Sequence, residues 1–94
     1  MRFAIIYRPK DPPTPEQMPA TTKAMAEWAQ KYGGKMDAFE FFIGGGGFGT
    51  LDIDDAAELS RMITENPYTL HSEIEIKPLV DPATGMAIAQ ETYS

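Results

Sequence analysis

The chain of 94 residues has no cysteine, one histidine and few basic residues. Without cysteine it has no disulfide framework, zinc ribbon or thiol nucleophile, and one histidine cannot build a multi-histidine metal site. Eight Lys and Arg stand against 14 Asp and Glu, which gives a formal net charge of −6. This balance excludes a typical nucleic-acid-binding protein, because that class needs a basic surface.

Long apolar runs are missing as well. No stretch reaches the roughly 20 apolar residues that span a bilayer, and the first ten residues, MRFAIIYRPK, have too short an apolar core for a signal peptide. With 43% hydrophobic and 23% charged residues, the composition is that of a globular protein. We therefore expect a cytoplasmic protein that binds neither membrane nor nucleic acid.

The small size predicts self-association. A domain of this length buries only about 60–65% of its unfolded surface, so its core is small. In the absence of a disulfide or metal site, a second copy of the chain is the simplest addition to that core. We expect one domain over residues 1–94, with a core at 1–80 and a C-terminal tail at 81–94, that forms a homodimer or a higher oligomer.

The N-terminal third predicts a strand, a loop and a helix. Residues 2–8 are rich in aromatic and β-branched side chains and are apolar on both faces, which is typical of a central strand. Its two faces carry Phe3, Ile5 and Tyr7 on one side and Ala4 and Ile6 on the other. Thr14 and Gln17 have capping-box spacing, while Pro19 marks either a kink or the true start of a helix that ends at Gly33–Gly34.

Three more elements and a return strand follow. Residues 36–43 and 50–53 flank Gly44–Gly49 and predict a hairpin. Asp55 is the expected N-cap of a helix that ends at Asn66-Pro67. Residues 71–77 alternate, which places Ile74 and Ile76 on one face of a strand and His71, Glu73 and Glu75 on the other.

The predicted order is β-α-β-β-α-β. Right-handed crossovers fold this order into a ferredoxin-like α+β domain, a four-stranded antiparallel sheet with two helices on one face. Two helices cover only one face, yet the first two strands are apolar on both faces. An exposed apolar sheet face is unfavourable in water, so we expect another subunit to cover it.

The second half of the chain resembles the dimeric α/β-barrel superfamily, first the muconolactone-isomerase-like proteins and next the YCII-related proteins. The residues that carry the resemblance are Gly49–Leu59, Asn66-Pro67-Tyr68 and Glu73–Leu79. The resemblance implies that two ferredoxin-like protomers pack sheet against sheet and hold a substrate between the sheets. Several enzymes of the superfamily use a histidine or a His–Asp pair, and this chain offers only His71.

The glycine run Gly44–Gly49 invites two interpretations. A phosphate-binding loop needs a helix after it and, in the Walker form, a Gly-Lys-Ser/Thr end, whereas here a strand follows and no lysine is near. A glycine-rich hairpin is therefore favoured. A loop over the mouth of a pocket is also compatible with this composition.

Three residues are candidates for proton transfer. His71 is the one side chain that ordinarily titrates near neutral pH, and Glu73 would assist it if their shared face lines the inter-subunit cavity rather than bulk solvent. Glu40 stands among phenylalanines, where an apolar setting favours a proton-carrying carboxylate. The alternative is that Glu40 lies at the strand edge in water or pairs with Arg2 or Arg8.

The expected substrate contacts are polar at one end and aromatic elsewhere. Tyr7 and Arg8 end the first strand and are suited to an anionic or carbonyl oxygen; the alternative is a packed tyrosine and a solvated arginine. Apolar walls are expected from Phe39, Phe41 and Phe42. We expect no metal and no cofactor.

The leading hypothesis is a small cofactor-independent enzyme with isomerase-like proton-transfer chemistry. Its substrate would be a small aromatic-derived or polyketide-like molecule in an inter-subunit cavity. A cofactor-free monooxygenase of the same fold is a close variant. The other classes are a non-catalytic small-molecule-binding or accessory protein and a structural unit whose tail swaps onto a neighbouring copy.

Overall fold

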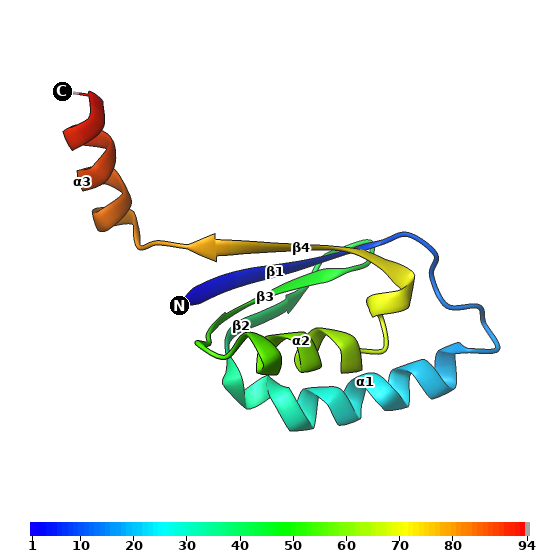
Figure 1. The fold of residues 1–94 in the computed structure, drawn as a ribbon. Helices are drawn as coiled ribbons and strands as arrows, with labels where there is room; N and C mark the ends of the chain where they lie inside the picture. The colour runs from blue at the N-terminus through cyan, green and yellow to red at the C-terminus, as the bar shows by residue number, and fades with distance from the viewer. Residues whose placement is uncertain (94) are drawn as a thin grey trace.

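The computed structural model describes residues 1–93, and these form an antiparallel sheet with two helices under one face and a third helix that stands apart (Figure 1). The elements are β1 (Arg2–Pro9), α1 (Met18–Tyr32), the 3-10 helix η1 (Gly33–Lys35), β2 (Met36–Phe41), β3 (Gly47–Asp52), α2 (Ala56–Glu65), the 3-10 helix η2 (Thr69–His71), β4 (Ser72–Leu79) and α3 (Pro82–Tyr93). The expected ferredoxin-like α+β fold is confirmed. Within residues 1–93, no helix is long and apolar enough to cross a membrane.

The sheet has the strand order β2-β3-β1-β4, and every neighbouring pair is antiparallel. β1 is central, as its two apolar faces predict. Ile5 of β1 lies opposite Gly49 of β3 and Ile76 of β4. Since Ile5 is buried among the helices, these registers define a helix-facing side of the sheet and an open side.

The core lies between the sheet and the C-terminal half of α1 together with α2. Leu51 and Met62 are completely buried, and Trp28 and Tyr32 pack with them. The Trp28 indole Nε1–H donates to the Met62 carbonyl oxygen at 2.8 Å. Lys31 of α1 pairs with Glu65 of α2 at 3.0 Å, and the Tyr32 hydroxyl donates to the same carboxylate. These contacts hold only the second half of α1 against its neighbour.

The start of α1 resolves the choice at Pro19. The helix begins at Met18 with Pro19 in its first turn, a position where proline loses no helical hydrogen bond. The Thr14 backbone N–H donates to Gln17 Oε1 at 2.9 Å, which is one half of the predicted capping box. This bond closes a separate turn ahead of the helix, because Gln17 itself is the residue before its first turn.

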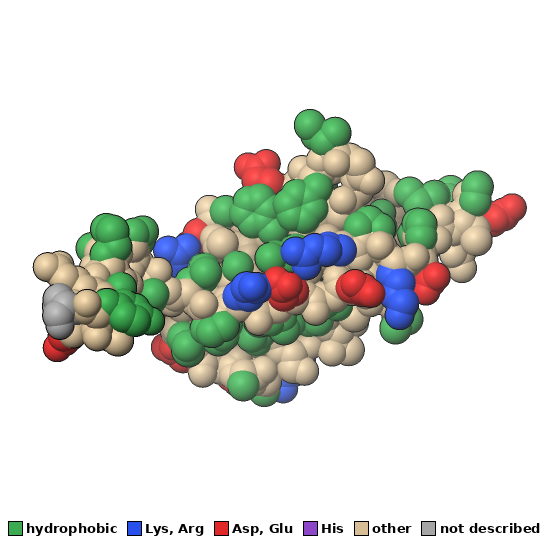
Figure 2. Space-filling model, turned by 90° about the horizontal axis from the view of Figure 1, so that it is seen from above, with side chains coloured by type: hydrophobic (Ala, Val, Ile, Leu, Met, Phe, Trp, Pro, Cys, Tyr) green, Lys and Arg blue, Asp and Glu red, His purple; other side chains and the backbone are tan. Residues whose placement is uncertain are grey.

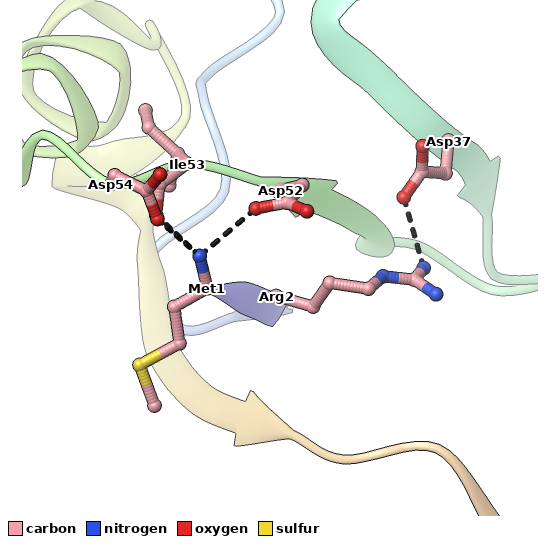
Figure 3. Close-up of polar contacts among 6 residues, drawn as sticks. All are labelled: Met1, Arg2, Asp37, Asp52, Ile53 and Asp54. Carbon is pink, nitrogen blue, oxygen red and sulfur yellow. Dashed lines mark hydrogen bonds and ion pairs between the residues drawn. The ribbon is translucent and has the colours of Figure 1, made fainter.

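A β-bulge changes the predicted faces of β2. Strict period-2 alternation would place Met36 on the side opposite Phe39, but the register shifts between Met36 and Ala38. Met36 therefore joins Phe39 in packing on the core, and the simple period-2 prediction is wrong at this residue. Arg2 reaches past β3 to pair with Asp37, at the bulge, at 2.9 Å (Figure 3).

The beginning of β1 is fastened to the loop before α2. The Met1 amine pairs with Asp52 at 2.9 Å and with Asp54 (Figure 3). The hydrogen bond to Asp54, and next that to Asp52, raises the pKa of the amine. In turn, the amine lowers the pKa of the Asp54 carboxyl. These groups are exposed, so the contacts set strand position more than they add stability.

The expected C-terminal tail contains a helix. Asp81 accepts hydrogen bonds from the Thr84 hydroxyl at 2.6 Å and from its backbone N–H at 2.9 Å, and these bonds lower the pKa of the Asp81 carboxyl. α3 follows and projects away from the sheet (Figure 1). Its Met86 and Ile88 side chains are exposed. Ser94, the last residue of the expected tail, lies outside the described residues.

Candidate functional site

A cavity of about 750 Å³ lies between the N-terminal half of α1 and the helix-facing side of the sheet. Met18, Thr22 and Met25 of α1 form one wall, and the sheet contributes Tyr7 and Phe39. This volume is within the range of roughly 300–1,000 Å³ that is usual for small-molecule sites. The cavity is present within a single chain, beneath the part of α1 that is not tied to α2.

Two glycines of β3 let neighbouring groups pack closely on the sheet beside this cavity. Gly47 lies opposite Tyr7 and Gly49 opposite Ile5, so both are at helix-facing positions and carry no side chain. A Cβ atom on Gly49 would lie 2.1 Å from Met36 Cε, and one on Gly47 would lie 2.6 Å from the Glu40 carbonyl oxygen. Neighbouring atoms therefore occupy the space directly over each glycine, and a larger residue would force them to move.

The predicted hairpin is confirmed, and its turn also lines the cavity. The Phe42 N–H donates to the Gly46 carbonyl oxygen at 2.9 Å. Gly45 and Gly46 have φ angles of 114° and 81°, which glycine adopts without steric cost. Because β3 rather than a helix follows, the run is not a phosphate-binding loop.

Tyr7 presents a hydroxyl to the cavity from the centre of the sheet. Its oxygen is 3.1 Å from Thr69 Oγ1. Thr69 uses its one hydrogen to donate to the Ile63 carbonyl oxygen, so Tyr7 is the donor in the contact with Thr69. Burial raises the pKa of Tyr7. At neutral pH the residue is a protonated phenol, and its oxygen can still accept a hydrogen bond.

His71 lies in η2, just before β4, and not in the strand to which its alternation assigned it. The tight turn is closed by the His71 N–H, which donates to the Tyr68 carbonyl oxygen at 3.0 Å. His71 Nδ1 donates to the Asp11 carbonyl oxygen at 2.7 Å, because a carbonyl can only accept. Nε2 is left as an acceptor, and the residue lines the same cavity as Tyr7.

The structure brings most of the predicted site residues to this cavity. Its lining includes Phe39, Phe41, Phe42 and Glu40. Glu40 is exposed on the edge strand β2 and lies opposite Phe48, at an open-face position, so its side chain is on the side of the sheet away from the helices. It makes no ion pair among residues 1–93, because Arg2 pairs with Asp37 and Arg8 with Glu75. The predicted alternative of an ion pair with either arginine is therefore wrong.

Arg8 and Glu73 are not brought to the cavity. They lie opposite each other on β1 and β4, at open-face positions of the sheet. The structure thus separates Glu73 from His71, with which the strand alternation had grouped it. A substrate space between two sheets would lie on this open face, and it stays a prediction.

Two further residues of the site were not identified from the sequence. Asn66, only 6% exposed, lines the cavity, and its Oδ1 accepts from the Tyr68 N–H at 2.9 Å. The sequence identified Asn66 only as the end of a helix, so its place in the cavity lining was not predicted. Thr69 orients Tyr7, and no local pattern connects residues 62 positions apart. In the described chain, no cluster of three or more His, Cys, Asp or Glu is placed to hold a metal ion.

No protein-family model matches the chain, and no curated protein matches it in sequence. Solved structures do match. The 5-chloro-2-hydroxyhydroquinone dehydrochlorinase TftG from Burkholderia phenoliruptrix AC1100, in complex with 2,5-dihydroxybenzoquinone, is 14% identical, with a TM-score of 0.70 over 89% of this chain and 98% of that one. A muconolactone isomerase is 19% identical, with a TM-score of 0.71 over 88% and 93%. The chain has their muconolactone-isomerase-like fold, as the resemblance implied.

Proposed function

We propose that the chain is a small cofactor-independent enzyme that moves a proton on an aromatic-derived or polyketide-like molecule. The observation that carries the proposal is the position of Tyr7 and His71. Both are held by η2, and both line an otherwise largely apolar cavity of about 750 Å³. The names of the two structurally similar proteins, a dehydrochlorinase and an isomerase, support this chemistry. The expected compartment is the cytoplasm.

The two side chains have complementary roles in the proposal. His71 Nε2 is the base, since its other nitrogen is fixed on the Asp11 carbonyl oxygen. The Tyr7 hydroxyl donates to Thr69 while the substrate is neutral. It turns its hydrogen to the substrate oxygen when negative charge develops there, which stabilises the transition state more than the ground state.

Hydrogen–deuterium exchange tests this proposal without knowledge of the overall reaction. Ring ketones and hydroxylated rings, including 2-naphthol and the dihydroxybenzenes, would be incubated with the protein in D₂O and followed by NMR. We expect deuterium to enter at carbons next to the oxygen-bearing carbon faster than in buffer alone. A protein that binds these compounds without faster exchange is a binding protein, and that result would contradict the catalytic proposal.

We also propose that the protein is a homodimer in which the open face of the sheet packs on a second copy. Figure 2 shows hydrophobic side chains on both sides of a row of charged side chains across this face. Ile6 and Phe48 lie opposite each other there, and the Phe48 ring stacks on Phe42 at 5.8 Å. The ion pairs of Glu75 with Arg8 and Lys77 neutralise much of the charge. A second copy would remove this apolar surface from water.

Replacing Ile6 by glutamate is expected to weaken the dimer by at least about tenfold, because association would bury an unpaired charge. Sedimentation equilibrium measures the association constant. Ile43→Glu is the matched control, because it introduces the same charge at a side chain that is fully exposed at the hairpin. Wild-type protein that is monomeric at micromolar concentration would refute the dimer, as would equal association of the two variants.

A further inference from the structure

The cavity has no lysine or arginine in its lining. Its one acidic residue, Glu40, lies opposite Phe48 and therefore at an open-face position of the sheet. On the surrounding elements Lys31 pairs with Glu65 and Lys35 with Glu58, while the exposed Lys10, Lys23 and Arg61 lie outside the lining. A ligand carboxylate placed here would lose its hydration without gaining a cation, and such burial is strongly unfavourable.

The first turn of α1 does not replace the missing cation. A helix N-terminus attracts anions through its free N–H groups. Here the Met18 N–H already donates to the Thr14 carbonyl oxygen at 3.1 Å, and Pro19 has no N–H. The nearest helix end therefore offers an anionic ligand little.

The distinctive polar groups of the cavity accept hydrogen bonds. Tyr7 has committed its hydrogen to Thr69, and His71 has committed its Nδ1 hydrogen to Asp11. The other polar side chains of the lining are neutral and can both donate and accept; they are those of Asn66, Thr22, Ser72 and Tyr68. A ligand that donates a hydrogen bond can therefore use Tyr7 and His71, whereas one that only accepts must rely on the other four groups.

We propose that the cavity selects an uncharged ring compound with a donating hydroxyl group, such as a phenol, hydroquinone or enol, and rejects ring carboxylates. This inference rests on the proposed function of the same cavity. The ring would lie against Trp28, Phe39 and Met25, which supply aromatic and sulfur contacts. The hydroxyl would donate to Tyr7 or His71.

Three naphthalenes with one skeleton test the inference by equilibrium dialysis. They are 2-naphthol, 2-methoxynaphthalene and 2-naphthoate, used at mildly alkaline pH, where the carboxylate is ionised and the naphthol largely keeps its proton. We expect 2-naphthol to bind at least about tenfold more tightly than either of the others. 2-Methoxynaphthalene lacks the O–H donor, and 2-naphthoate adds a negative charge that no lysine or arginine of the lining compensates.

A variant pair tests the charge argument separately. Met18→Lys adds a cation to the cavity wall, and Gln30→Lys adds the same charge at an exposed α1 position outside the lining. We expect 2-naphthoate binding to rise at least about fivefold in the first variant and to stay unchanged in the second.

The outcomes separate this inference from the proposed function. If 2-naphthoate binds wild-type protein as tightly as 2-naphthol, the selection against anions is refuted while the cavity remains a binding site. Equal binding of 2-naphthol and 2-methoxynaphthalene refutes the requirement for a donor. Failure of all three probes to bind overturns the cavity as the site and the proposed function with it.

Discussion

Tyr7→Phe is expected to slow enzyme-dependent deuterium exchange by a factor of about 10²–10⁴. The substitution keeps the ring and removes only the hydroxyl that would stabilise the developing charge. The lost hydrogen bond to Thr69 costs only about 1 kcal/mol of stability. Ligand affinity, measured by dialysis, should fall much less than the exchange rate, since the proposed contact strengthens in the transition state.

Tyr93→Phe is the control for this substitution, because Tyr93 is 88% exposed on α3. It should exchange deuterium at the wild-type rate. The pH dependence gives a second check. Burial raises the pKa of Tyr7 in the folded chain. The stabilisation that Tyr7 provides through this shift is present below its unfolded-state pKa of about 10, and it is lost as pH rises through the folded-state pKa. Full activity in Tyr7→Phe would remove Tyr7 from the mechanism.

Leu51→Ala is expected to lower the free energy of unfolding by about 2–5 kcal/mol. Leu51 is completely buried on β3, opposite Phe3 of β1 and Met36 of β2. Its truncation leaves a void in the core between the sheet and the helices, which cannot close without moving one of these layers. For a domain whose total stability is about 5–15 kcal/mol, this loss is readily measured by urea denaturation.

Leu70→Ala makes the same chemical change at a side chain that is 91% exposed in η2. It should alter the free energy of unfolding by less than about 0.5 kcal/mol. Equal destabilisation by the two substitutions would mean that Leu51 is not the centre of the core.

The parts of the fold that local patterns determine were predictable from sequence. Alternation identified the two faces of β1. The acidic residues before α2 identified Asp55 as its N-cap, and in the structure the Asp55 carboxylate accepts from the Ala57 N–H at 2.9 Å. The element order follows from such signals. Each depends on neighbours a few residues apart, which one sequence displays directly.

Features that depend on distant contacts were not predictable. The alternation around residue 71 suggested one continuous strand, but His71 belongs to a turn that binds Asp11, 60 positions earlier. The bulge beside Asp37 breaks the period-2 pattern that placed Met36. Two glycines of β3 face the helices beside the cavity, and that direction is known only from the register with β1.

We expect the ligand to bind under α1 within one chain. The six methionines test it directly, because four of them line the cavity, Met18, Met25, Met36 and Met62, and two do not, Met1 and Met86. Methyl NMR of protein labelled with ¹³C-methyl-methionine would be recorded during titration with 2-naphthol. Ring currents from a bound naphthalene should shift the methyl resonances of the cavity methionines.

We expect saturable shifts of the cavity-lining methyls and unchanged resonances for Met1 and Met86. If dialysis of the same sample confirms binding but all four cavity methyls stay unshifted, the ligand binds elsewhere and the site under α1 is refuted.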